Sequence, residues 1–593
     1  MPVQAPQIVT KLLSRLWQHL SQRRRRHFAF LLVLMILASL SEVLSIGAVM
    51  PFIAVITAPG RVFEHAAAQP FIGFLGLTSA DQLLLPLAIA FGLAALIAGA
   101  VRLLVLWAST RLAFATGAEF SIDIYRRTLY QTYAVHLTRN SSEIIAGISV
   151  KTNSVIHVTM MSLNFVSASI ILTVLLIAML AVDPVIALAA IGGFGSIYGV
   201  IVWITRHRLL SNSQRIAHES TQVVKSLQEG LGGIRDILIN GSQSVYCEIY
   251  RSAEFPSRRA QGSSAFIGAS PRYAMEALGM ILIAGLAYVL AQQSDGVARV
   301  IPVLGALALG AMRILPVLQL AYGAWSAIQG ERAALRDILD LLDQPLPEHA
   351  GRSVISPLPF RQHISLAQVS FRYSADTPWI LHNFNLTIPK GSRIGFIGVT
   401  GSGKSTLLDI IMGLLLPTSG ILAIDGQAIT PGNNRAWQTH IAHVPQAIFL
   451  ADTTIEENIA FGQPISEIDH ERVRSAARQA QIADIIETWP EQYQTFVGER
   501  GIRLSGGQRQ RIGIARALYR NPSVIIFDEA TSALDSETEQ AVMQAIEGLS
   551  HNLTILIVAH RISTLKNCTL IVELGDKGIL RTGTYQDIVS AAA

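Results

Sequence analysis

Residues 393–411 read RIGFIGVTGSGKSTLLDII. An apolar, strand-like stretch runs into a glycine-rich loop and then into an apolar helical stretch, which is the strand–loop–helix context of a phosphate-binding P-loop. In such a loop successive backbone N–H groups point at phosphate oxygens, and the dipole of the following helix adds to their attraction. An ordinary glycine-rich turn needs neither the lysine nor the hydroxyl. We therefore predict nucleotide binding by Gly398, Val399, Thr400, Gly401, Ser402, Gly403, Lys404, Ser405 and Thr406.

The side chains around this loop are suited to ATP and Mg²⁺. We expect Lys404 to reach the β- and γ-phosphates and Ser405 to ligate Mg²⁺. A second apolar strand, residues 523–527, ends in the acidic pair Asp528 and Glu529. We assign Mg²⁺ binding through water to Asp528, and we expect Glu529 to polarise the water that attacks the γ-phosphate. Either acid alone fits a solvated strand end, but the P-loop in the same chain weakens that interpretation.

A third motif lies between these two strands. Residues 504–508 read LSGGQ and lead into a basic helical pattern over residues 509–516. Together with the P-loop and the acidic strand end, this pentapeptide resembles the signature motif of ABC transporters. The resemblance covers about residues 360–590, and the apolar N-terminal part is similar to that family in the number and order of its spans. It implies that ATP is also contacted by Ser505, Gly506, Gly507 and Gln508.

Four further positions match functional residues of the ABC family. Tyr373 matches the aromatic residue that stacks on adenine, although a half-buried strand tyrosine would look the same. Gln446 matches the glutamine that contacts Mg²⁺ and the attacking water, and Asp535 lies in the match to the D-loop. His560 matches the switch histidine on the γ-phosphate, and its place at a strand end favours that role over a surface histidine. The resemblance thus adds a glutamine and a histidine to the catalytic glutamate.

The resemblance also implies a dimer. In ABC transporters the signature of one subunit closes over the P-loop of another. The physical basis is sound, because a helix N-terminus with a serine hydroxyl and glycine N–H groups forms a second clamp for an anion. One chain contains one P-loop and one signature, and both Glu529 and His560 are present. We therefore expect a homodimer with two equivalent ATP sites.

The N-terminal part of the chain is membrane-embedded by composition. Only 15% of the 593 residues are charged, whereas soluble domains carry about 25%. Six apolar runs are near the ~20 residues that a membrane-crossing helix needs, and they cover about 28–56, 83–115, 156–182, 184–205, 273–292 and 300–328. The predicted fold class is an α-helical six-span transmembrane domain plus an α/β P-loop nucleotide-binding domain. The predicted domains are a cytoplasmic N-terminal segment (1–27), a transmembrane domain with cytoplasmic coupling loops (28–330), a linker (331–359) and an ABC nucleotide-binding domain (360–593).

Lysine and arginine residues indicate the orientation of the spans, because they concentrate in cytoplasmic loops. They crowd before the first span and after the second and fourth, so we predict a multi-pass protein of the bacterial inner (plasma) membrane with both termini in the cytoplasm. The polar stretches 118–155 and 206–265 keep helical periodicity, and we expect helices prolonged into the cytoplasm. Transverse pieces near 136–144 and 229–239 are then coupling helices by analogy with the family.

Charge and cysteine content exclude other kinds of site. A net charge of +5 without a basic stripe favours contact with anionic lipid and indicates no nucleic-acid partner. Cys247 and Cys568 lie far apart and have no metal-ligand neighbours, so we expect two inert thiols rather than a disulfide or a metal site.

The membrane part resembles a narrower group. Residues 41–57, 233–236 and 313–316 resemble lipid-linked oligosaccharide flippases of the PglK type. The external segment 61–80 is rich in apolar residues, and we expect either a short helix in the outer interface, as in those flippases, or a lipid-facing loop. The resemblance implies that the chain, within the lipid bilayer, moves a polyprenyl-pyrophosphate-linked glycan from the inner to the outer leaflet.

Charged residues inside spans are functional-site candidates, because a charge in lipid is costly. Arg102, Arg272 and Arg313 lie in predicted spans or at their ends, and guanidinium groups bind phosphates in a planar bidentate mode. We expect these three residues to contact the pyrophosphate. An internal ion pair, such as Arg313 with Glu42, or snorkelling of Arg272 toward the headgroups, explains them equally well.

Two other functions stay open on the sequence. An ABC exporter of lipids, peptides or drugs shares every nucleotide-site motif, and ATPase stimulation by hydrophobic amines would favour it. A membrane ATPase that regulates a partner without transport belongs to a different class. The intact Glu529 argues against this class, because a nucleotide sensor can dispense with the general base.

Overall fold

The structure is a computed structural model. It describes residues 9–47, 52, 55–56, 59–64, 69, 72–73, 76–182, 184–291, 297–347, 350–351, 356–529, 539–542, 544, 553–559 and 562–590. The chain divides into two compact units. The membrane unit comprises Met1–Gln131 and Arg139–Leu346, and the nucleotide-binding unit comprises Thr132–Thr138 and Pro347–Ala593.

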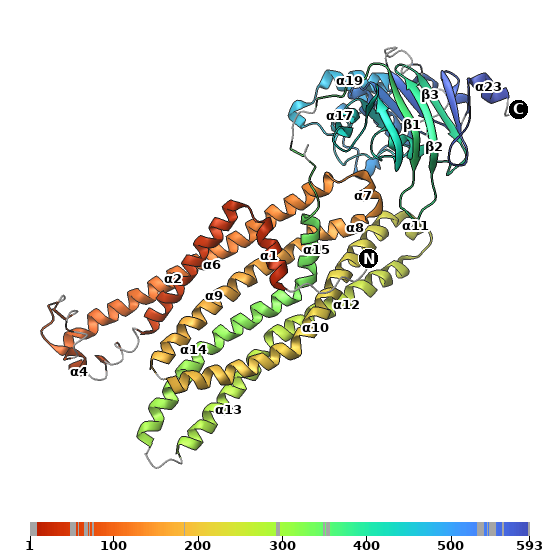
Figure 1. Ribbon diagram of the computed structural model, residues 1–593. Coiled ribbons are helices and arrows are strands. Elements are labelled where there is room, and N and C mark those ends of the chain that lie inside the picture. The colour runs from red at the N-terminus through yellow and green to blue at the C-terminus, as the bar shows by residue number, and fades with distance from the viewer. Residues whose placement is uncertain are drawn as a thin grey trace. The chain divides into compact units, whose positions relative to one another are not determined.

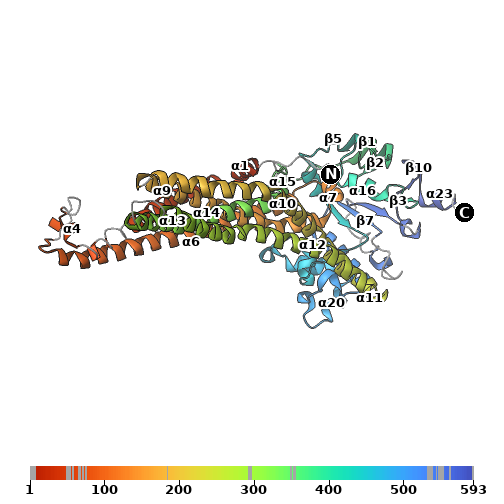
Figure 2. The ribbon, with the colours of Figure 1, turned by 90° about the horizontal axis from the view of Figure 1, so that it is seen from below.

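Six helices of the membrane unit each contain one of the predicted apolar runs in whole or in large part (Figure 1). They are α2 (Gln22–Gly47), α6 (Leu84–Leu129), α9 (Thr152–Val182), α10 (Pro184–Gly232), α13 (Pro271–Ala291) and α14 (Val297–Gly330). Figure 1 and Figure 2 both show these helices running side by side. The first apolar run continues past α2 into residues 48–51, which lie outside the described residues.

Apolar side chains cover the outside of these helices. Phe30 of α2 is 74% exposed and Leu96 of α6 is 72% exposed, which is the reverse of the packing in a soluble core. Within the described ranges, Ala80–Leu129 and Ser141–Ile177 are long and apolar enough to cross a membrane, judged by length and composition. Apolar outer faces of this kind indicate helices that lie in lipid.

Short helices follow the second and fourth long helices, where coupling helices were expected. They are α7 (Tyr133–Thr138) and α8 (Ser141–Ile145) after α6, and α11 (Ile234–Ile239) between α10 and α12 (Gln243–Ala269). The structure divides the expected piece 136–144 into two, because Asn140 begins a new helix. Its backbone is extended, and its side chain accepts a hydrogen bond from Ser142 N at 3.0 Å.

A π-helical stretch, η2 (Ala146–Lys151), joins α8 to α9 and packs on the linker helix α15 (Arg332–Leu342). Lys151 is only 7% exposed, and its Nζ is bound to the carboxylate of Asp337 in α15. A Cβ on Gly147 would come within 2.6 Å of Leu341 Cδ1, so the absence of a side chain permits this close approach. π-Helical turns are rare, and they concentrate at functional sites.

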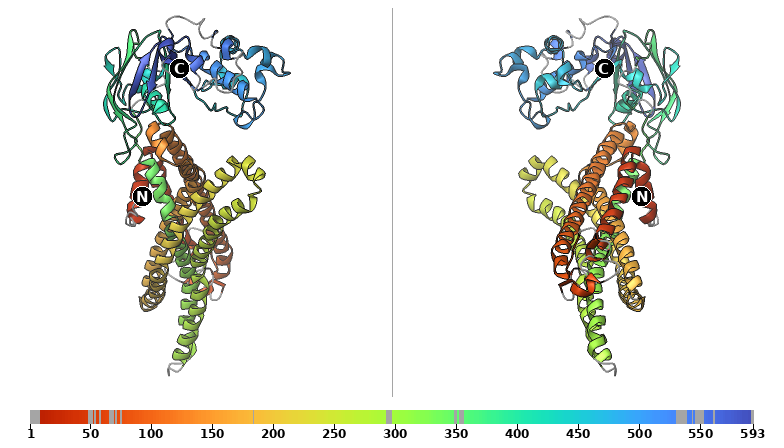
Figure 3. Two further views of the ribbon diagram at one scale, coloured as in Figure 1. Left: turned by 90° about the vertical axis from the view of Figure 1, so that its right-hand side faces the viewer. Right: turned by 90° about the vertical axis from the view of Figure 1, so that its left-hand side faces the viewer.

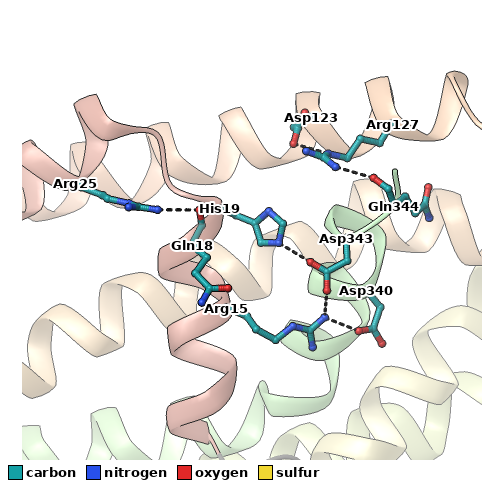
Figure 4. Close-up of polar contacts among 9 residues, drawn as sticks. All are labelled: Arg15, Gln18, His19, Arg25, Asp123, Arg127, Asp340, Asp343 and Gln344. Atoms are coloured by element: carbon teal, nitrogen blue, oxygen red, sulfur yellow. Dashed lines mark hydrogen bonds and ion pairs between the residues drawn. The ribbon is translucent and has the colours of Figure 1, made fainter. Parts of the chain in front are cut away.

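The first helix, α1 (Val9–His19), also packs against α15. One face of α1 and the residue after it carry buried leucines at four-residue spacing, and these are Leu12, Leu16 and Leu20. Polar contacts also join α1 to α15 and the residue after it (Figure 4). Arg15 is bound to Asp340 and Asp343, and His19 Nε2 lies 2.7 Å from Asp343 Oδ1. Both kinds of contact hold α1 on the start of the linker.

The external segment is described in parts. The helix α4 (Pro59–Phe63) lies near its start, and the 3₁₀ helix η1 (Ala80–Leu83) follows it. Val62 and Phe63 pack against a buried cluster of Val55, Ile72 and Leu83. The remainder of the predicted interfacial helix falls largely on residues outside the description, which are 65–68, 70–71 and 74–75.

Two sheets form the framework of the nucleotide-binding unit (Figure 3). The smaller sheet is antiparallel with the order β2-β1-β4-β5, and the larger has the order β10-β9-β3-β8-β7-β6 and is parallel from β9 to β6. The strands are β1 (His363–Phe371), β2 (Leu381–Pro389), β3 (Arg393–Gly398), β4 (Ser419–Ile424), β5 (Gln427–Ala428), β6 (Ile441–Val444), β7 (Val524–Asp528), β8 (Thr554–Val558), β9 (Leu570–Leu574) and β10 (Ile579–Gly583). The central strands are continuous apolar runs, because both of their faces are buried.

Helices cover these sheets and enclose two cores. They are α16 (Lys404–Ile411), α17 (Asn434–Gln438), α18 (Ile455–Ile459), α19 (His470–Gln479), α20 (Ala483–Glu487), α21 (Gly506–Tyr519) and α23 (Tyr585–Ser590). One core contains Phe384, Phe396 and Trp437, which are at most 1% exposed. The other packs α19 and α21 against the larger sheet through residues such as Val473 and Ile512. The larger sheet is therefore buried on both sides, and its strand ends are held firmly.

Candidate functional site

The motifs of the nucleotide-binding unit meet at one edge of the larger sheet. Strands β3, β8, β7 and β6 are parallel, so their carboxyl ends lie at the same edge. The P-loop follows β3, Asp528 is the last residue of β7, and Gln446 comes shortly after the end of β6. Sheet topology thus gathers residues that are far apart in the sequence into one site.

The backbone of the P-loop is one that glycine adopts readily. Gly398, Gly401 and Gly403 have φ angles of 149°, 86° and 90°. A Cβ on Gly398 would also lie 2.5 Å from a carbonyl oxygen of β9. The Lys404 ammonium donates to the carbonyl oxygens of Gly398 at 2.8 Å and Val399 at 3.0 Å. The lysine charge therefore lies within the curve of the loop, where a P-loop binds phosphate.

The first turn of α16 carries the two hydroxyl side chains that follow the lysine. Ser405 is exposed, whereas Thr406 is buried and its Oγ1 lies 3.1 Å from the hydroxyl oxygen of Tyr373. The Tyr373 side chain is 49% exposed and stands edge-on to Phe371. An accessible ring beside the P-loop helix is suited to stacking on a planar base.

Gln446 and Glu529 are in direct contact. Gln446 Nε2 donates to Glu529 Oε2 at 2.8 Å. Glu529 has a φ of 52°, a left-handed backbone that costs a non-glycine residue free energy of order 1 kcal/mol. Its N–H donates to the carbonyl of Val558 at the end of β8. The hydrogen bond from Gln446 fixes the direction of this carboxylate just after the end of β7.

Asp409 of α16 is a residue of this site that the sequence reasoning missed. It lies one turn after Ser405, on the same side of the helix. Burial of the carboxyl, and in second place the charge of Asp528, raises the pKa of Asp409 to about 6. The available signal was a single acid within the apolar helix that follows the P-loop. The two carboxylates together give the sheet edge an affinity for a proton or a cation.

The signature residues form the beginning of α21. Ser505 Oγ accepts a hydrogen bond from Gln508 N at 3.2 Å, and Gln508 Oε1 accepts one from Ser505 N at 2.8 Å. This reciprocal capping box fixes the helix end, and the N–H groups of Gly506 and Gly507 lie in its first turn. Among the hydrogen bonds of the described residues, none joins this turn to the P-loop. Gln508 thus has a structural task that the motif alone did not reveal.

The three membrane arginines have different surroundings. Arg102 Nη1 of α6 lies 3.6 Å from Glu42 Oε1 of α2, and 52% of the Arg102 side chain is exposed. Arg272 Nε lies 2.9 Å from Glu276 Oε1 on an exposed part of its own helix. Arg313 lies in α14, but its side chain is outside the described part of the chain. Glu42, the partner suggested for Arg313, forms an ion pair with Arg102.

The residues at the sheet edge fit a magnesium nucleotide. The Ser402 hydroxyl is buried in the loop and lacks a hydrogen-bond partner within the described structure, so a bound phosphate oxygen would satisfy it. The Ser405 hydroxyl and the Asp528 carboxylate are oxygen ligands of the kind that Mg²⁺ prefers. Val399 and Thr400 are exposed in the same loop. Two predicted residues, Asp535 and His560, lie outside the described residues.

Two family models match the chain. Residues 381–532 match the model described as ABC transporter, and residues 27–298 match the model described as ABC transporter transmembrane region. A solved structure described as a bacterial Atm1-family ABC exporter with ATP bound superposes with a TM-score of 0.77, covers 96% of each chain and is 24% identical. These matches confirm the predicted fold class of a helical transmembrane domain plus an α/β nucleotide-binding domain.

Several characterised proteins are similar in sequence. The ATP-dependent lipid A-core flippase of Chromohalobacter salexigens is 32% identical over 66% of this chain and 67% of its own length. The flippase of the same name from Alkalilimnicola ehrlichii is 31% identical over 67% of each chain. The alpha-hemolysin translocation ATP-binding protein HlyB of Escherichia coli O157:H7 is 39% identical over 47% of this chain, and the alignment spans 38% of that relative.

Proposed function

Because this chain belongs to the ABC transporter family, we propose that it is a membrane ATPase that flips a lipid-linked, polyprenyl-pyrophosphate oligosaccharide from the inner to the outer leaflet. The observation that carries the ATPase assignment is the contact between Gln446 and Glu529 at the sheet edge that bears the P-loop. We place the protein in the bacterial inner membrane with both termini in the cytoplasm. The loop arginines and lysines support this orientation.

The residues at the sheet edge divide the work of ATP hydrolysis. The P-loop N–H groups and Lys404 hold the phosphates and offset the charge that they carry. Gln446 orients Glu529, whose carboxylate accepts a proton from the water that attacks the γ-phosphorus. Ser405 and Asp528 are the residues that would hold Mg²⁺, which when bound neutralises part of the phosphate charge.

The start of α21 supports a homodimer. Ser505 Oγ accepts from a backbone N–H within its own helix, so its hydroxyl proton remains available for an outside acceptor. The N-terminus of this helix is a clamp for an anion that would come from a second chain. His560 and Asp535 receive the switch and D-loop roles in this proposal from the family resemblance.

The membrane unit supports a lipid with an anionic headgroup. The Arg102 guanidinium lies 3.6 Å from Glu42, which is longer than a hydrogen bond, and half of the side chain is exposed. Because this ion pair is long, the guanidinium can also bind a phosphate oxygen in a bidentate manner. The relatives named lipid A-core flippases support a lipid substrate, and the pyrophosphate-linked glycan is the narrower proposal. Arg313 is retained as a further contact, whereas Arg272 already pairs with Glu276.

Flipping of a fluorescent lipid-linked oligosaccharide by the purified protein in proteoliposomes tests this proposal. Arg102→Ala should lower flipping and substrate-stimulated ATPase by about tenfold or more, because a charge-assisted hydrogen bond is lost. Arg102→Lys should retain part of the activity, since lysine keeps the charge without the bidentate geometry. Arg258→Ala, which removes an exposed arginine paired with Glu254 on α12, is the matched control.

Two outcomes would refute the proposal at different levels. Full flipping by Arg102→Ala would remove the pyrophosphate contact from this arginine. Failure of every lipid-linked oligosaccharide to stimulate the ATPase would remove the substrate class.

A second candidate function is the export of another lipid, a peptide or a drug. The similarity to lipid A-core flippases and to a hemolysin translocation protein favours it. Stimulation of ATP hydrolysis by lipid A or by hydrophobic amines, without a response to lipid-linked oligosaccharide, would decide for this function. A wild-type rate no higher than that of Glu529→Gln would instead indicate a membrane ATPase regulator without transport.

A further inference from the structure

The exposed surface of α2 includes a row in which two arginines precede four apolar residues. The members are spaced three and four residues apart in alternation, which places them on one side of a helix. They are Arg23, Arg26, Phe30, Val33, Leu37 and Leu40, and all six are exposed. The apolar part of the row is exposed on a membrane-spanning helix and is therefore suited to contact acyl chains. The two arginines stand at the end of this apolar part, where lipid headgroups are expected.

The other two arginines of the basic run already have partners within the protein. Arg24 donates to Glu119 from Nε at 2.9 Å and from Nη2 at 2.7 Å. Arg25 donates to the carbonyl oxygen of Gln18 at 2.9 Å (Figure 4), and its guanidinium lies 6.0 Å from the ring centroid of Trp17. No hydrogen bond or ion pair is formed by Arg23 or Arg26 within the described chain. The run thus contains two anchoring arginines and two that face outward.

An aromatic side chain stands beside the basic end of α2. Trp17 of α1 is 45% exposed, although it stands edge-on to Phe28 with ring centroids 5.7 Å apart. Tryptophan is enriched at membrane–water interfaces, because its ring is apolar and its N–H is polar. Trp17 is therefore suited to the headgroup level of a bilayer at the basic end of α2.

We propose that Arg23 and Arg26 bind the phosphate groups of anionic phospholipids whose acyl chains lie along the exposed row of α2. A second copy of the chain is a poorer occupant. In a two-fold symmetric contact, the row of one copy would pack against the same row of the other. The row contains no described acid that could offset the charge of the arginines. Acyl chains with an anionic headgroup complement both parts of the row. The site is independent of the flipping proposal, because it lies on the outer face of α2.

Binding of phosphatidylglycerol and phosphatidylcholine to the purified full-length chain, measured by native mass spectrometry, tests the proposal. The wild-type chain should bind phosphatidylglycerol more tightly. The double variant Arg23→Gln/Arg26→Gln should lose about fivefold in phosphatidylglycerol affinity per arginine, with no change for phosphatidylcholine. Arg23→Lys/Arg26→Lys should keep most of the preference, because a phospholipid phosphate accepts a lysine charge as well.

The matched control lies in the same basic run. Arg24→Gln removes one charge whose partner is Glu119, so it should leave the phosphatidylglycerol preference intact even if it lowers the melting temperature. Equal affinity of the wild type for both lipids, or an undiminished preference in the double variant, would overturn the proposal. So would efficient chain-to-chain crosslinking through Val33→Cys in a Cys247→Ser background, since it would place a second copy on the row.

Discussion

Phenylalanine side chains are buried in the nucleotide-binding unit but exposed on the surface of the membrane unit. In the nucleotide-binding unit, Phe384 and Phe396 are at most 1% exposed, whereas Phe30 of the membrane unit is 74% exposed. The first two are removed from water by other side chains, and the third is removed from water by lipid. Stability in one unit therefore comes from side-chain packing, and in the other it depends on the bilayer.

The two units also differ in how well their functional residues can be recognised from the sequence. A phosphate site needs particular residue types at fixed spacings, so the P-loop and the acidic strand end identify it. Lipid-facing helices need only apolar side chains, so their substrate contacts have no comparable motif. The lesson is that the ATPase half of the protein can be assigned from residues, and the substrate half has to be assigned from contacts such as that of Arg102 with Glu42.

The largest effect should come from the nucleotide-binding unit. Glu529→Gln should lower the turnover of ATP by about 10² to 10⁴-fold, because the attacking water loses its proton acceptor while the side-chain shape is kept. Steady-state ATPase and nucleotide-binding assays on the reconstituted protein check this. Glu471→Gln, an exposed carboxylate on α19, should leave turnover unchanged. An active Glu529→Gln variant with normal turnover would break the contrast between the units at its strongest point.

The two thiols should react at very different rates. Cys247 of α12 is exposed, but burial raises the pKa of Cys568 in the nucleotide-binding unit to about 12. Its thiolate fraction near pH 8 should be about a thousandfold lower than that of an ordinary thiol. Maleimide labelling followed by mass spectrometry checks this, with the unfolded chain as control. Comparable rates in the folded protein would show that the core between α19, α21 and the larger sheet opens readily.

The raised pKa of Cys568 also makes the free energy of unfolding depend on pH. The unfolded chain releases the Cys568 proton near pH 9 and the folded chain releases it only near pH 12. The folded state binds more protons between these values, so the free energy of unfolding should fall as pH rises across this window. Cys568→Ala should reduce that slope in denaturant titrations at high pH.

The same substitution should have unequal effects on the two units. Phe384→Ala should lower the free energy of unfolding of its unit by about 3 kcal/mol, because it leaves a cavity in a packed core. Phe30→Ala should change stability by less than about 1 kcal/mol, since lipid fills the space. Thermal and denaturant unfolding of both variants in one lipid composition compare them. Equal losses would mean that Phe30 is packed against protein and not lipid.

The smallest effect concerns the attachment of α1 to α15. Burial alone would raise the pKa of Asp343, but hydrogen bonds from Arg15 and His19 outweigh it and lower the pKa. The stabilisation is therefore present above the ordinary pKa of an aspartate and is lost as pH falls through the folded value. For exposed ion pairs it amounts to about 0.2–1 kcal/mol. Hydrogen exchange of α1 amides, corrected for intrinsic rates, should rise in Asp343→Asn and stay unchanged in the exposed control Asp484→Asn.

Much of the fold was predictable because periodicity and motifs are local. The six apolar runs gave the long helices, and the strand–loop–helix pattern gave the P-loop. Contacts across the fold were not predictable in the same way. That Glu42 pairs with Arg102 depends on which helices are neighbours. Asp409 of α16 was missed because its raised pKa depends on burial and on the charge of Asp528 in β7, which is far away in the sequence.

The π-helical stretch η2 has a consequence for insertions and deletions. Its turn is wider than that of an α-helix, so it sets the rotation of α8 about the helix axis relative to α9. An α-helix rotates by about 100° per residue. Removing a single residue between Gly147 and Val150 would therefore turn α8 by about that angle relative to α9, and the buried Ser142 would rotate out of its contacts. The length of η2 can consequently change only by a number of residues that restores the relative rotation of α8 and α9, whichever side chains are inserted or removed.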